Sequence, residues 1–149
     1  MESTDGVPQY CTFHLGELFL GINVEHVQEV IRYQEMTRVP LADDSVRGLI
    51  NLRGQIVTAI DLRRRFRLPP REELPMNVVV HEGEEALSLL VDEIGDVVEV
   101  PAELVEAPPA TLTGPTRELV SEVCKLEGRL LLIVDVAQVA GRAGQARAA

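Results

Sequence analysis

Short apolar runs recur along most of the chain. They are rich in Val, Ile and Leu, and Gly, Pro or Asp separates them roughly every 8 to 12 residues. Runs of this length and spacing are typical of the strands of a β-sandwich or β-barrel. The pattern predicts an all-β fold with a few short helices, for which the candidates are residues 24–32, 43–50 and 135–141.

Two internal echoes indicate a duplication. LRGQIVTAIDL, from Leu52, and LEGRLLLIVDV, from Leu126, share a Leu, a Gly, an apolar run and an Asp at a constant offset of 74 residues. GELFLGINVEHVQEV, from Gly16, and GEEALSLLVDEIGDV, from Gly83, align at an offset of 67 residues. The echoes predict two similar β modules, roughly 9–68 and 76–140, each too small to be stable alone and therefore packed together. Chance similarity between apolar strands is the alternative.

The length of 149 residues and the hydrophobic content of 46% suit one compact body. Its apolar runs are far shorter than the roughly 20 residues of a membrane-spanning helix, and its acidic start is unlike a signal peptide, so we expect a cytoplasmic protein. Residues 1–8 and 141–149 lack an apolar period and are expected to be flexible tails. Cys11 and Cys124 stand singly in apolar stretches, which favours buried, reduced thiols over a disulfide or a metal site.

Charge is unevenly distributed along the chain. Residues 32–71 hold nine Arg and four acidic residues, a net charge of +5, although the whole protein carries −10. Four of these Arg, at positions 63, 64, 65 and 67, form a row that can in principle release counterions from a nucleic acid. The negative net charge of the whole protein and its aromatic content of only 3% argue against a nucleic-acid partner. We interpret the row as a solvated face or as a docking patch for an acidic protein.

Side chains capable of catalysis are few and scattered. Asp61, Asp92 and Asp135 each follow an apolar run, where a carboxylate can serve acid–base chemistry or bind a metal, but an Asp at a strand end commonly bonds the backbone of the next turn. Metal-ligand spacing and a nucleophile motif are absent around the three histidines, His14, His26 and His81. No P-loop or GxGxxG sequence is present. The sequence therefore predicts no catalytic residue, no cofactor and no metal.

Several motifs together resemble one known family. EVIR, TRVP, VRGLINLRG, IDLRRRF and VDEIGDV occur in the order and approximate spacing of the CheW-type coupling proteins of bacterial chemosensory arrays, and the resemblance covers about residues 9–140. It implies two SH3-like five-stranded barrels packed around a shared apolar core. It also implies a non-enzymatic scaffold that links transmembrane chemoreceptors to the histidine autokinase CheA, in the cytoplasm beside membrane-bound receptor arrays.

The same resemblance implies a set of partner-contact positions in VQEV and RGLINLRG: Val27, Glu29, Gly48, Asn51, Leu52, Arg53 and Gly54. An Arg raised on a Gly-flanked turn can offer a planar fork of donors to a partner's carboxylate or carbonyl. A plain hairpin turn is the alternative for any one of these residues. Two positions depart from the family pattern, because Thr58 stands where Pro is usual and Glu122 where Gly is frequent. If the latter position requires a positive φ, Glu122 is strained.

Two other functions remain open at this point. One is a decoy that binds the receptor without activating the kinase. The other is an enzyme or small-ligand sensor on a β-barrel scaffold, which a deep pocket with converging Asp or His side chains would favour. A flat or grooved apolar surface would favour the adaptor.

Overall fold

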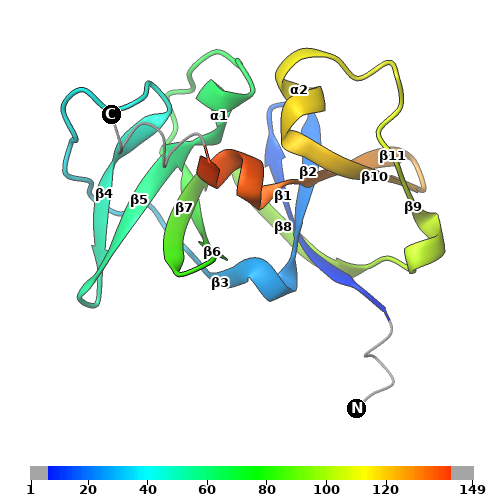
Figure 1. The fold of residues 1–149 in the computed structure, drawn as a ribbon, viewed down its shortest axis with the longest axis horizontal. Coiled ribbons are helices and arrows are strands. Elements are labelled where there is room, and N and C mark those ends of the chain that lie inside the picture. Colours follow the sequence, from blue (N-terminus) through cyan, green and yellow to red (C-terminus); the bar gives the residue numbers. More distant parts are fainter. Residues whose placement is uncertain (1–6, 142–149) are drawn as a thin grey trace.

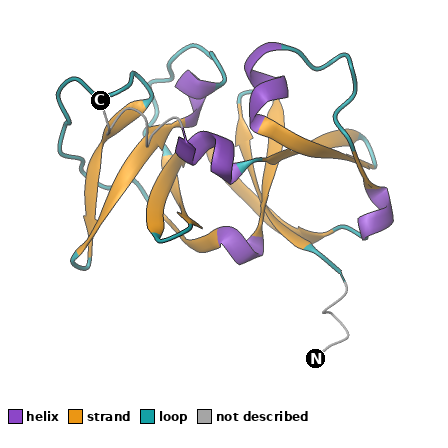
Figure 2. Ribbon diagram, viewed as in Figure 1, coloured by secondary structure: helices purple, strands orange, loops and turns teal. Residues whose placement is uncertain are grey.

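The computed structural model describes residues 7–141 and contains two packed β-sheets with a few short helices (Figures 1 and 2). Sheet A contains, in spatial order, β8 (Glu93–Glu99), β1 (Gln9–Leu15), β2 (Leu18–Asn23), β11 (Arg129–Val134), β10 (Val120–Leu126) and β9 (Val105–Glu106). Sheet B contains β3 (Val27–Ile31), β6 (Met76–Glu82), β7 (Glu85–Val91), β5 (Gln55–Asp61) and β4 (Val46–Leu52). The predicted all-β fold class is confirmed.

The helices are short and lie at strand ends. They are η2 (Val24–His26), α1 (Leu62–Arg65), η3 (Ala102–Leu104), α2 (Gly114–Leu119) and a helical turn over residues 136–141. Asp61 caps α1 by accepting from the Arg64 N–H at 3.3 Å, and Asp135 caps the last turn by accepting from the Gln138 N–H at 3.2 Å. The two capping Asp occupy equivalent places in the 74-residue echo. The structural interpretation of these two carboxylates is therefore supported by their contacts.

Of the three helix predictions, the one over 43–50 is wrong, and the one over 24–32 holds only for Val24–His26, which form η2. Residues 27–31 form β3 and residues 46–52 form β4, whereas the helix expected over 135–141 is present. In β3 the register shifts between Val27 and Glu29, a bulge that changes which side chains share a face and so imitates a helical period. Antiparallel pairing with β6 decides the conformation, because local periodicity is a weaker constraint than a complete strand ladder.

The duplication is visible in the order of elements, but the two sheets do not follow the two halves of the chain. Hairpins β1–β2 and β6–β7 turn at Gly16 and Gly83, both with positive φ, as the 67-residue echo indicates. The first hairpin pairs with β8 and β11 from the second half, and the second hairpin pairs with β3 and β5 from the first half. The prediction that 9–68 and 76–140 form separate packed modules is therefore wrong, because the halves exchange hairpins.

The largest cluster of buried apolar side chains spans both sheets. It includes Phe13 and Leu20 of sheet A together with Ile60 and Leu87 of sheet B, all fully buried. A shared core of this kind means that neither sheet buries its apolar face without the other. Two smaller clusters fill the interior of each sheet separately.

Cys11 and Cys124 are buried free thiols, as predicted. Burial raises the pKa of both thiols, which keeps them protonated and unreactive. The predicted flexible tails fall outside the described residues, apart from residues 7, 8 and 141. No helix within residues 7–141 has the length and apolar character needed to cross a membrane.

Candidate protein-interaction site

The turn between β4 and β5 displays an Arg. Arg53 and Gly54 have φ values of 52° and 91°, and Leu52 pairs with Gln55 on either side of them. Two central residues with positive φ define the type I′ hairpin turn, which follows the natural twist of the strands. The Asn51 side-chain oxygen accepts a hydrogen bond from the Gly54 N–H at 2.8 Å and fixes the turn. Arg53 is therefore held at the tip, with 69% of its side chain exposed.

The Arg53 guanidinium binds the Glu29 carboxylate of β3. Gln28 donates to the same carboxylate at 3.2 Å and to the Gln55 side chain at 3.4 Å. Because β3 and β4 are the two ends of sheet B, these contacts bring the ends together. The hydrogen bonds from Arg53 and then Gln28 hold the pKa of Glu29 below its ordinary value, although burial opposes them. The carboxylate is therefore ionised and paired at neutral pH.

The other three predicted site residues lie inside the fold. Leu52 is buried in the apolar cluster of sheet B, and Val27 is half-buried against the shared core. Gly48 is buried beneath the segment at residues 36 and 37, where a Cβ would lie only 2.7 Å from the Thr37 carbonyl oxygen. The structure therefore brings Glu29, Asn51, Arg53 and Gly54 together at the surface and places Gly48, Leu52 and Val27 behind them.

The sequence did not indicate which residues surround the Glu29–Arg53 pair. Gln28 and Gln55 join the same polar network, and Val30 and Ile56 are exposed apolar side chains on the strands that carry them. Val30 lies within residues 24–32, for which the sequence predicted a helix. We define the Arg53 surface as Gln28, Glu29, Val30, Arg53 and Ile56, a polar centre with apolar residues on its flanking strands.

The Arg row that follows β5 is mainly structural. Arg63 donates to both oxygens of Asp92 at 2.8 Å and 2.7 Å, and the second oxygen also accepts from the Gly16 N–H at 2.7 Å. Burial raises the pKa of Asp92, but the bonds from Arg63 and Gly16 outweigh it and the pKa lies below its ordinary value. Arg65 is buried and donates to the carbonyl of Val139 at 3.0 Å. The interpretation as a solvated face or docking patch is therefore wrong for Arg63 and Arg65 and survives only for Arg64 and Arg67, whose side chains are exposed.

The remaining candidates for chemistry do not gather into one site. His26 and Asp135 border a cleft of about 300 Å³, but Asp135 caps a helix there, and His14 packs its ring 5.2 Å from that of Phe19. The described part of the chain contains no group of three or more His, Cys, Asp or Glu side chains placed to hold a metal. The hollow of about 910 Å³ between α1 and α2 is open, and its lining contains three Arg and three acidic residues but no His.

The two departures from the family pattern cause no visible strain. Thr58 is buried within β5, paired with Leu49 and Leu87. Glu122 lies exposed in β10 beside a bulge. The non-glycine residues with positive φ in the described chain are Leu41, Arg53 and Arg67, so the strain considered for Glu122 does not occur.

Comparison with known proteins agrees with this architecture. The model of the CheW-like domain matches residues 9–143. The chain is 31% identical over 134 residues to the chemotaxis protein CheW of Treponema pallidum, covering 86% of this chain and 79% of that protein. It is 34% identical over 118 residues to the chemotaxis protein CheW of Bacillus subtilis, covering 77% and 75% of the two chains.

A solved structure has the same fold. The crystal structure of the scaffolding protein TtCheW from Thermoanaerobacter tengcongensis superposes with a TM-score of 0.80 at 27% identity, covering 87% of this chain and 89% of that one. The family match spans nearly all of the described residues and both sheets. The chain therefore belongs to the CheW family of non-enzymatic adaptor proteins.

Proposed function

We propose that this protein couples transmembrane chemoreceptors to the histidine autokinase CheA, within a chemotaxis or related chemosensory pathway. The family membership and the relatives named as chemotaxis proteins support an adaptor in such signalling. Its work is to bind two partners at once and to fix their relative placement, so that kinase activity follows the receptor state. We expect it in the cytoplasm, at the inner face of membrane-bound receptor arrays.

The observation that carries the proposal is the Glu29–Arg53 pair on the Arg53 surface. Arg53 is largely exposed, yet its guanidinium is held at a fixed place by a rigid type I′ turn and by Glu29. A partner carboxylate or carbonyl can take over some of the five donors of the guanidinium without moving the backbone. Exchange of Arg53 between Glu29 and a partner gives the adaptor two local arrangements, which is the minimum that a signalling contact requires.

The decoy and the enzyme are distinguished by what the protein does with its partners. A pull-down from native cytoplasm with the tagged full chain is expected to recover both CheA and receptors, whereas an enzyme on this scaffold recovers neither. In reconstituted receptor membranes, adding the chain is expected to raise CheA autophosphorylation. A decoy binds the receptor and leaves the kinase at its basal rate. That result would replace coupling with the decoy function.

A further inference from the structure

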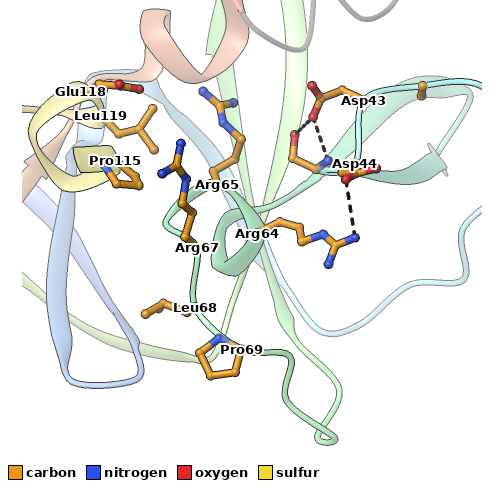
Figure 3. Close-up of a pocket in the computed structure, with 12 residues that line it drawn as sticks. Asp43, Asp44, Arg64, Arg65, Arg67, Leu68, Pro69, Pro115, Glu118 and Leu119 are labelled. Carbon is orange, nitrogen blue, oxygen red and sulfur yellow. Dashed lines mark hydrogen bonds and ion pairs between the residues drawn. The ribbon is translucent and has the colours of Figure 1, made fainter.

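A hollow of about 910 Å³ lies between α1 and α2, on a part of the molecule that the Arg53 surface does not include (Figure 3). One wall is α1 with the turn after it, from sheet B, and the other is α2, which leads into sheet A. The half-buried Leu68 supplies apolar surface, and the exposed Arg64 and Arg67 supply charge. A second hollow of about 410 Å³ adjoins it and shares Arg64 and residues 42–44. We call the two together the α1–α2 groove.

Arg67 occupies a backbone position that suits glycine. The Arg67 N–H donates to the Arg64 carbonyl at 3.0 Å, and the Leu68 N–H donates to the Arg63 carbonyl at 2.7 Å. This is the Schellman ending of a helix, and its left-handed residue is usually Gly. Here Arg67 takes that position with φ of 59°. Arg67 therefore places a long side chain at a position whose backbone conformation favours glycine.

The Arg67 side chain is not used by the fold. Figure 3 shows it extending from the turn toward Pro115 and Leu119 of α2, whereas Arg64 points the other way, toward Asp44. Within residues 7–141 its guanidinium makes no hydrogen bond or ion pair. A strained residue whose side chain serves no internal contact suggests a function outside the molecule.

Leu41, at the other end of the α1–α2 groove, is also a non-glycine residue in a left-handed conformation. It has φ of 66° and its side chain is fully exposed. Of the three non-glycine residues with positive φ among those described, Arg53 belongs to a hairpin that requires the conformation, and the other two, Leu41 and Arg67, both border this groove. A large apolar side chain and a free cation are thus presented on one surface.

The charge of the α1–α2 groove identifies the partner. Five Arg and three acidic residues line it, although the protein as a whole carries −10. One of the acids, Asp43, is turned inward and accepts from the Ser45 hydroxyl at 2.7 Å. We propose that the α1–α2 groove is a second protein-binding surface, which takes an acidic amphipathic segment of a partner. Carboxylates of that segment pair with Arg67, and its apolar side chains pack on the exposed Leu41 and the half-buried Leu68.

The test needs neither receptor nor kinase, so its failure leaves the coupling proposal untouched. The probe is a short fluorescent peptide of alternating glutamate and leucine, titrated into the full chain and followed by anisotropy and by backbone amide NMR shifts. We expect binding that weakens with salt and shift changes at residues 41–47, 64–69 and 115–119. The matching lysine–leucine peptide should not bind. Equal binding of the two peptides would overturn the proposal.

Arg67→Gly separates binding from folding. Glycine relaxes the left-handed position, so the melting temperature should rise while peptide affinity falls about tenfold, the loss of one charge-assisted contact. Leu41→Gly should behave in the same way. Arg32→Gln removes an exposed Arg outside the α1–α2 groove and should leave affinity unchanged. Wild-type affinity in Arg67→Gly would overturn the assignment of Arg67 as the anchor.

Discussion

Arg63 binds both carboxylate oxygens of Asp92, and this pair joins the two sheets. Arg63 lies in α1, directly after strand β5 of sheet B, whereas Asp92 lies where the chain passes from β7 of sheet B to β8 of sheet A. One Asp92 oxygen also accepts from Gly16 in the β1–β2 turn of sheet A, and Arg71 lies 3.4 Å from it. Three parts of the chain, around residues 16, 63–71 and 92, therefore meet at one carboxylate, which is only 8% exposed.

Asp92→Asn should destabilise the protein by about 2 kcal/mol. The change leaves the partly buried Arg63 guanidinium without its counter-ion, which is costly. Urea unfolding measures the difference. Asp44→Asn is the matched control, since Asp44 is exposed and lies 3.8 Å from the Arg64 guanidinium, and it should leave the unfolding midpoint unchanged. Equal midpoints for Asp92→Asn and wild type would mean that the pair does not hold the sheets.

The contribution of Asp92 should depend on pH in one direction. Its pKa in the folded protein lies below the ordinary value of 3.8, so the folded state binds this proton less readily than the unfolded state does. The stabilisation is then complete above the unfolded pKa and is lost as the pH falls through the folded pKa. We expect the difference in unfolding free energy between wild type and Asp92→Asn to be constant from about pH 5 to pH 7 and to shrink below about pH 4. If the difference in unfolding free energy grew as the pH fell, it would contradict a lowered pKa of Asp92 in the folded protein.

Arg65 and Arg64 should differ in effect although they are neighbours in the sequence. Arg65 is buried and bonds the carbonyls of Val139 and Gln138, which end the last helical turn. Arg65→Gln should lower the melting temperature by several degrees, roughly the effect of 1 to 2 kcal/mol in a domain of this size. The Arg64→Gln variant should have the same melting temperature as the wild type. Identical melting curves for both variants would show that the Arg65 contacts do not stabilise the fold.

The exchange of hairpins predicts that neither half of the chain folds alone. Residues 1–72 contain β1 to β5, but β1 and β2 pair across to β8 and β11, and β3 and β5 pair across to β6 and β7. Each fragment would expose the apolar face that the shared core buries. Fragments 1–72 and 73–149 should each lack a cooperative thermal transition, and mixing them should restore one. Cooperative unfolding of either fragment by itself would contradict the shared core.

The sequence predicted what depends on local pattern. Strands such as β5 and β11 have mainly apolar runs and turn residues at both ends, and the 67-residue echo located equivalent hairpins around Gly16 and Gly83. The pairing between halves left no such signal, because strands of similar composition are compatible with several partners. A bulge in β3 also produced a helical period where a strand exists. Register and partner choice are set by tertiary packing, which local propensity does not encode.

The candidate site was predictable only in part, for the same reason. The resemblance placed Glu29 and Arg53 in one set of residues but gave no indication that they bind each other. Arg63 and Asp92 are 29 residues apart, and Arg65 and Val139 are 74 apart. A row of Arg in an acidic protein resembles a surface patch unless these distant partners are known. Burial and pairing of charges therefore required the structure.

The central claim is that Arg53 acts in coupling and not in folding, and receptor-dependent autophosphorylation of CheA in reconstituted membranes tests it most directly. Arg53→His should melt like the wild type, because the side chain is 69% exposed, and should fail to activate the kinase. Arg53→Lys keeps the charge but lacks the planar fork, so it should fail as well if the contact is bidentate. Full kinase activation by Arg53→His at normal stability would contradict the account, and a large fall in its melting temperature would assign Arg53 to the fold.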